Sequence, residues 1–173
     1  PALRKRIAEA GRAVLAARAT PAQAVVTLSD AVAMRARMLR ELPPDGPWDV
    51  KAIPGGLVEV EFIAQALQCV HAADHPRAAS ARTREAIERL ARARLLPAAD
   101  AAVLIRADRL WRTTQALLRL TVGRPKTEAL PSSVAASLLR EAGPLAVPPG
   151  GTAPVDLPSL RARMTETAVE VRA

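Results

Sequence analysis

The segment at residues 48–65 holds the residue types whose spacing could support chemistry: a lysine, a glycine pair and two nearby glutamates. Gly55 and Gly56 permit a tight backbone turn directly before a predicted helix. Glu59 falls in the first helical turn, where the helix dipole favours a negative charge. Glu61 follows two positions later, so a regular helix points the two carboxylates about 200° apart. From the residues alone, the pattern predicts a turn and an acid-rich helix start, and the two glutamates are not expected to chelate one metal ion.

A second group of potential ligands follows in the sequence. His71 and His75 are four residues apart and share a face if the helix continues that far, with Cys69 and Asp74 nearby. We expect no metal site here, because the predicted helix ends close to Asp74 and no second ligand pair follows.

The composition of the chain favours helices as the elements that position these residues. The chain has 173 residues, of which half are apolar, 24% are charged and only 2% are aromatic. Alanine, leucine and arginine dominate and are good helix formers, whereas strands favour aromatic and β-branched residues. A single cysteine excludes an intrachain disulfide framework. Since the sequence shows neither a bilayer-length apolar run nor a secretory signal, we expect a cytoplasmic protein.

Hydrophobic periodicity and capping residues predict an all-α fold, a bundle of about six to seven helices forming a single domain over residues 1–173. Ser80 is the expected N-cap of the fourth helix, and the Pro- and Gly-rich stretch 144–158 is predicted to be an exposed, flexible loop. The last helix reaches the final residue without a stop signal, so we expect a fragment of a larger enzyme. The helices are predicted over about 3–18, 22–41, 57–72, 81–95, 97–121, 132–142 and 158–172.

The positive charge of the chain is concentrated in its middle third. The formal net charge is +8, and residues 76–128 alone carry 12 basic and 5 acidic side chains, a net +7. Such a segment suits an anionic partner, although a solvated helix face with surplus arginine explains it equally well. On the helix predicted over 97–121, four arginines lie opposite the apolar side and form a candidate partner-binding face: Arg106, Arg109, Arg112 and Arg119.

The segment at 49–65 resembles the signature that follows the nucleotidyltransferase core in the glutamine synthetase adenylyltransferase family. That pattern is Asp-aliphatic-Lys, then Gly-Gly-aliphatic, an acid, an aliphatic residue, Glu-Phe and a later Gln. The matching positions are Asp49, Lys51, Gly55, Gly56, Leu57, Glu61, Phe62 and Gln65. Glu59 departs from the pattern, because Asp is usual there in the adenylylating half. Residues 34–38 and 83–91 also resemble family segments, and the likeness extends over about residues 25–121.

The resemblance implies the C-terminal helical domain of the adenylylating half, since the Gly-Gly-Arg typical of the deadenylylating half is absent. The family's Gly-Ser loop and Asp-x-Asp pair are also absent from this sequence. The resemblance therefore implies that ATP and magnesium are bound mainly by a core outside this chain. It also implies that this chain alone is inactive. The implied partners are glutamine synthetase, the PII signalling protein and the rest of the enzyme's own chain.

For the residues themselves, the resemblance implies no catalytic group in this chain. Lys51, Glu59 and Glu61 would support the reaction by ordering the nucleotide or a loop of the substrate protein. Motif positions with a structural role would be Asp49, Gly55, Gly56, Phe62 and Gln65.

Two other interpretations stay open on the sequence. A basic helical module could bind nucleic acid or an acidic protein partner, but nucleic acid is disfavoured because the chain lacks a helix-turn-helix and almost all aromatic residues. A helical oligomerisation domain would instead show an exposed apolar stripe and form a dimer.

Overall fold

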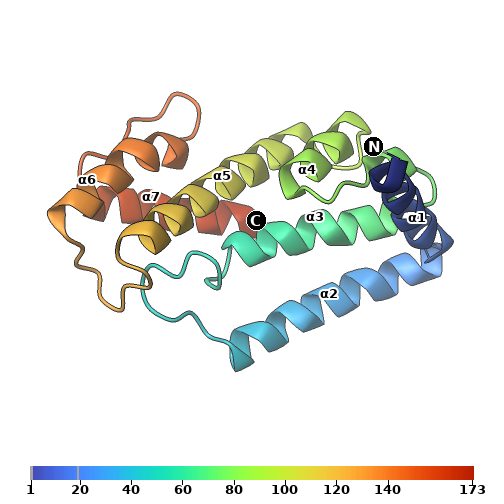
Figure 1. Ribbon diagram of the computed structural model, residues 1–173, viewed down its shortest axis with the longest axis horizontal. Coiled ribbons are helices and arrows are strands. Elements are labelled where there is room, and N and C mark those ends of the chain that lie inside the picture. The colour runs from blue at the N-terminus through green and yellow to red at the C-terminus, as the bar shows by residue number, and fades with distance from the viewer. Residues whose placement is uncertain (1, 19) are drawn as a thin grey trace. The chain divides into compact units, whose positions relative to one another are not determined.

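The computed structural model describes residues 2–18 and 20–173, and within them it confirms the all-α fold (Figure 1). These residues form seven α-helices and two 3₁₀ turns, and none is in a strand. The helices are α1 (Ala2–Arg18), α2 (Pro21–Glu41), α3 (Leu57–His71), α4 (Thr83–Arg92), α5 (Ala98–Thr121), α6 (Ser132–Glu141) and α7 (Leu157–Arg172), with 3₁₀ turns at Pro76–Ala78 (η1) and Gly143–Ala146 (η2). No helix in this described part of the chain is both long and apolar enough to cross a membrane.

Local capping chemistry explains where several helices begin. The Thr20 hydroxyl accepts a hydrogen bond from the Gln23 amide at 3.2 Å, as expected for the N-cap of α2. Asp156 and Ser159 form a reciprocal capping box at the start of α7. The prediction for Ser80 was wrong: α4 begins at Thr83, and the Ser80 hydroxyl instead accepts from the Arg82 amide and donates to a carboxylate one turn further on.

By their contacts, the residues fall into two compact units, so the single domain over 1–173 stays a prediction. The first unit comprises the residues up to Arg37 together with Glu61–Ala101. The second comprises Met38–Val60 and Ala102–Ala173.

The first unit has a core built mainly from small residues. Ile87 and Leu90 of α4 are its largest fully buried side chains, and most of the others are alanines. Buried Gln68 accepts a hydrogen bond from the Ser80 amide at 2.6 Å, and Arg89 donates to the Ala79 carbonyl at 2.6 Å. These bonds hold the segment between α3 and α4 against the helices. Several apolar residues that define the predicted second helix nevertheless remain exposed: Val25, Leu28, Val32 and Met34.

The second unit has the larger side chains in its core. Trp111, Leu110, Leu138 and Leu160 are fully buried, and they come from α5, α6 and α7. The stretch 144–158 is not uniformly exposed as predicted, because Ala146 is buried where η2 contacts α6 and α7.

Candidate functional site

The glycine pair forms a tight turn that contacts residues of α3, α5 and α7. Gly55 has a φ of +75°, and its amide donates to the Glu59 carboxylate. Its carbonyl accepts from the buried Trp111 indole at 3.1 Å. The α7 backbone lies so close that a Cβ on Gly55 would sit 2.7 Å from the Ala168 Cα and overlap the adjacent carbonyl. Only glycine satisfies both the backbone angle and the close approach.

The loop before the turn is organised by the carboxylate of Asp49. Its two oxygens accept from the Asp45 amide at 3.0 Å and from the Ala52 amide at 3.3 Å. A Cβ on Gly56 would collide with the carbonyl of Val50, which itself accepts from the first amide of α3 at 3.0 Å. Asp49 and Gly56 therefore shape the backbone that leads into α3.

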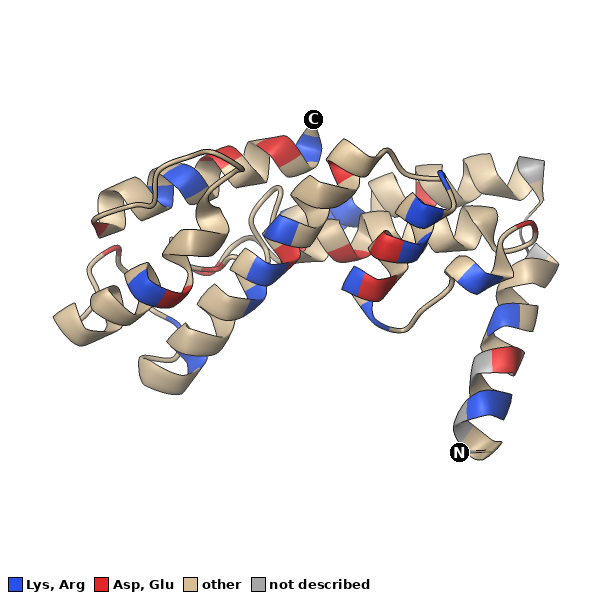
Figure 2. Ribbon diagram, turned by 90° about the horizontal axis from the view of Figure 1, so that it is seen from above, with Lys and Arg blue, Asp and Glu red and all other residues tan. Residues whose placement is uncertain are grey.

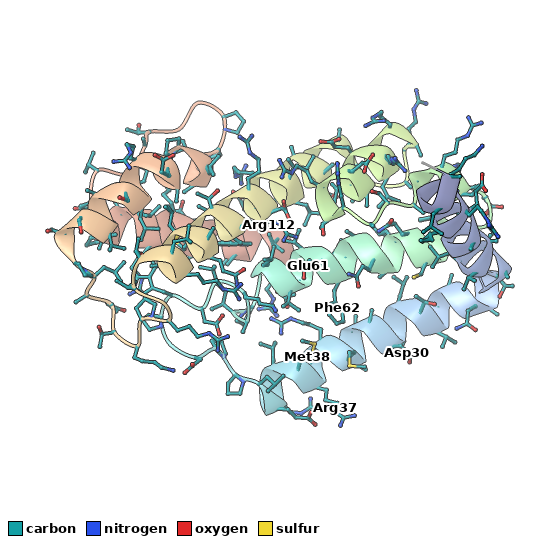
Figure 3. The ribbon with its side chains drawn as sticks, in the orientation of Figure 1. Asp30, Arg37, Met38, Glu61, Phe62 and Arg112 are labelled. Atoms are coloured by element: carbon teal, nitrogen blue, oxygen red, sulfur yellow. The ribbon has the colours of Figure 1, made fainter. Side chains whose placement is uncertain are left out.

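The three residues proposed to support the reaction differ in environment. Glu59 lies in the first turn of α3, and its side chain is 15% exposed, bonded to the turn and 3.9 Å from the Arg172 guanidinium. Lys51 is exposed in the loop of the second unit. Glu61 is half-buried and belongs to the first unit, and it projects from α3 in a different direction from Phe62 (Figure 3). Of these three residues, it is Glu59 that bonds to the glycine turn, whose preceding loop is organised by Asp49.

The α3 motif continues with two residues of the first unit. Phe62 is half-buried, and Gln65 is exposed.

The segment also builds a pocket that the sequence did not predict. The indole Nε1 of Trp48 donates to the Glu128 carbonyl at 3.2 Å, and the Arg161 guanidinium lies 5.5 Å from the indole ring centroid while pairing with the Glu128 carboxylate. Beside them is a cavity of about 310 Å³ with a mostly apolar lining: Pro47, Trp48, Val50, Ile53, Pro54, Arg161, Met164, Thr165 and Ala168. Its one charged residue could orient a small apolar or planar group through cation–π and polar contacts.

The arginines of α5 do not form one uniform face. Arg106 is only 15% exposed in its side chain and pairs with Glu170 of α7. Arg112 donates through Nε to the carboxylate of Asp108 at 2.7 Å. Arg109 and Arg119 are exposed. Across the described residues, Lys and Arg are interspersed with Asp and Glu along the helices (Figure 2).

Asp108 is a residue that the sequence interpretation missed. It is 1% exposed, and its buried charge is balanced by the arginine one turn later. The only sequence signal is the Asp-to-Arg spacing of four, which also occurs on fully exposed helices.

The other titratable candidates show no metal-binding arrangement. Within residues 2–18 and 20–173, no three or more His, Cys, Asp or Glu side chains are placed to hold an ion. Burial raises the pKa of the Cys69 thiol above its usual value, which favours the neutral form.

Comparisons with known proteins agree with the resemblance seen in the motif. A family model described as GlnD PII-uridylyltransferase matches residues 32–170. A bifunctional glutamine synthetase adenylyltransferase/adenylyl-removing enzyme of Rhodopseudomonas palustris (strain BisB5) is 39% identical over 173 residues, which is 100% of this chain and 16% of that protein. The enzyme of the same name from Bradyrhizobium sp. (strain BTAi1 / ATCC BAA-1182) is 34% identical over 172 residues, 99% of this chain and 16% of that protein.

A third relative with that name, from Caulobacter vibrioides, is 44% identical over 114 residues, or 65% of this chain and 11% of its own length. No solved structure matches the chain. The chain spans only 16% of the length of the first two relatives. The chain therefore belongs to the family described as GlnD PII-uridylyltransferase, and it resembles over its whole length one part of the bifunctional glutamine synthetase adenylyltransferase/adenylyl-removing enzymes.

Proposed function

We propose that this chain is the helical domain that follows the nucleotidyltransferase core in the adenylylating half of such an enzyme. In that role it supports ATP-dependent transfer of AMP to glutamine synthetase in nitrogen regulation. The observation that carries the proposal is the glycine turn at residues 55–56. The motif residues Asp49 and Glu59 accept its loop and turn amides, and Trp111 of α5 and the α7 backbone lie against it. Similarity over the whole of this chain to one part of the bifunctional enzymes supports its place in such an enzyme.

Within this role, Lys51 is better suited than Glu59 to contact nucleotide or substrate protein, and Glu61 is a further supporting residue. Glu59 already accepts the Gly55 amide and lies beside Arg172, so its charge serves the turn. Lys51 is exposed and offers a point charge for phosphate oxygens or an acidic loop. Phosphoryl-type transfer depends mainly on positioning and electrostatics, so residues outside the reacting atoms can affect its rate.

The catalytic groups, with ATP and magnesium, belong to the core outside this chain, and the chain alone is inactive. Glutamine synthetase, the PII protein and other parts of the enzyme's own chain are the partners in the cytoplasm. Arg109 and Arg119 are the arginines of α5 best suited to an acidic protein surface, because Arg106 and Arg112 are engaged by carboxylates of this chain. Nucleic acid is disfavoured for the same reason, since pairing reduces the charge available to phosphates.

The test is incorporation of AMP from labelled ATP into purified glutamine synthetase by the natural longer polypeptide and by this chain alone. Lys51→Ala and Glu61→Ala, introduced into the longer polypeptide, should each lower the rate about tenfold, the size of a lost positioning contact worth about 1.4 kcal/mol. Glu166→Ala is a control at an exposed position of α7 and should leave the rate unchanged. Full activity in the Lys51 and Glu61 variants contradicts the supporting role, and activity of the chain alone contradicts its inactivity.

A second candidate follows from the description of the family model, which names a PII-uridylyltransferase. In that case the longer polypeptide would transfer UMP from labelled UTP to the PII protein. Measuring both reactions with the same preparation decides between the two acceptors.

A further inference from the structure

Helix α1 carries an apolar seam whose large side chains are exposed. Leu3, Ile7 and Val14 are 62–69% exposed, although they are the large apolar residues of that helix face. With two exposed alanines they follow the alternating spacing of four and three that is typical of a coiled-coil seam: Leu3, Ile7, Ala10, Val14 and Ala17. A helix with this pattern normally packs against another helix.

Helix α2 also carries exposed apolar residues. Val25, Leu28 and Val32 have the same spacing and are 44–72% exposed. Residues 20–34 contain a single charged residue, Asp30, which lies on α2 (Figure 3). Scattered exposed apolar residues are ordinary, but a set on one face of an almost uncharged stretch of helix marks an interaction surface. We name these residues of α1 and α2 together the N-terminal seam.

The N-terminal seam lies almost wholly outside the region that defines the family. The family model begins at residue 32, whereas the seam runs from Leu3 to Val32. The relatives that match the whole chain are much longer, since the chain spans 16% of them. The family model therefore leaves most of the seam unmatched, and most of the length of those relatives lies outside this chain.

The charge of α1 indicates what can cover its seam. The helix contains five basic residues and one acidic residue, Glu9. Pairing with a second copy through α1 would place like charges beside each other, which disfavours self-association. The seam is narrow and lacks Trp and Phe, unlike helices that lie in a membrane interface. A helical surface with its own apolar seam would cover the apolar residues, and acidic flanks on it would pair with the basic residues of α1.

We propose that the N-terminal seam is the docking surface for the part of the same longer polypeptide that precedes residue 1, through an apolar helical face with acidic flanks. This proposal rests on the proposed function, because it needs the chain to be one part of a larger enzyme. Docking there would bury the exposed residues of α1 and α2 and fix the preceding part against the family module.

Hydrogen exchange in the natural longer polypeptide tests the proposal. Amides of residues 2–34 should exchange at least about tenfold more slowly in the longer polypeptide than in this chain alone. The combined substitutions Ile7→Asp, Val14→Asp and Val25→Asp in the longer polypeptide should abolish that protection. The matched control is Val169→Asp, because Val169 is a valine on α7 of the second unit that is 64% exposed. It should leave the protection unchanged.

Other occupants give different results. A dimer of this chain in sedimentation, lost in the triple Asp variant, would assign the seam to a second copy and overturn the proposal. Binding of this chain to vesicles of phosphatidylserine and phosphatidylcholine, lost in the same variant, would assign it to a membrane surface and overturn it too. Equal exchange of residues 2–34 in both proteins would also overturn it.

The AMP-transfer assay of the longer polypeptide separates the two proposals. Protection without AMP transfer leaves the docking surface standing and removes the proposed function. AMP transfer without protection of residues 2–34 leaves the proposed function standing and removes the docking surface.

Discussion

Replacement of Gly55 by alanine tests whether the glycine turn is a packing requirement of the second unit. The substitution adds one methyl group at a residue whose φ is +75° and whose neighbour is the backbone of α7. Because the colliding atoms belong to the Ala168 backbone, no side-chain rotation relieves the overlap. Either α7 moves away or the turn changes its conformation, and in the second case the hydrogen bond from Trp111 is lost.

The expected loss of stability is the sum of three contributions. A left-handed conformation costs an L-residue about 1–2 kcal/mol. Overpacking against a rigid neighbour costs about 1–3 kcal/mol. A weakened hydrogen bond to the buried indole adds about 1 kcal/mol. The total of about 3–6 kcal/mol is a large part of the stability of a typical domain, about 5–15 kcal/mol.

Urea unfolding followed by far-ultraviolet circular dichroism measures the change. Gly123→Ala is the matched control, because Gly123 has a φ of +77° and a Cβ there would meet nothing within 4 Å. It should lose only the conformational contribution, about 1–2 kcal/mol. If Gly55→Ala costs no more than Gly123→Ala, the close approach of α7 does not constrain the residue type at position 55.

Three further changes are expected to behave as follows. Thr114→Val should leave stability unchanged or raise it by about 1 kcal/mol in urea unfolding, because the Thr114 hydroxyl is fully buried and finds no hydrogen-bond partner among the described residues. Trp111→Phe should cost about 1–3 kcal/mol in the same assay, because it leaves the Gly55 carbonyl buried without its donor. Ser80 and then Arg89 lower the pKa of Glu85 below its ordinary 4.5. Glu85→Gln should therefore lower the free energy of unfolding at neutral pH. The difference in stability between the variant and the parent should disappear as the pH falls below 4.5 through the folded-state pKa of Glu85. Thermal unfolding measured at a series of pH values checks this.

The helices could be predicted from the sequence because their signals are local. Apolar spacing, Thr20 before α2 and Pro97 before α5 act within a few residues, and the predicted ends differ from the observed ones by at most about three residues. Ser80 misled the prediction because a serine near a helix start can bond to loop amides as well as to the first helical turn.

Which faces are covered could not be predicted, because coverage depends on distant segments. Periodicity identifies the apolar side of α2 but not whether another element packs on it, and Val25 and Val32 are exposed. In the same way, Arg106 has the spacing of a solvated face, but its side chain is only 15% exposed and pairs with Glu170, 64 residues later. The Trp111 bond to Gly55 joins residues 56 apart and has no local signal.

The contacts of the motif limit which of its residues remain for chemistry. The carboxylates of Asp49 and Glu59 accept hydrogen bonds from the loop and the turn, and Gly55 and Gly56 have no room for a side chain. Substitutions at these four positions therefore act through folding. A lost reaction in a Glu59 variant would accordingly not show that Glu59 meets the substrate. Lys51 is exposed, and its removal disturbs no hydrogen bond of the turn described here. A rate change at Lys51 with unchanged stability would therefore be direct support for a role of this segment in nucleotide transfer, and it is the most informative single variant in the chain.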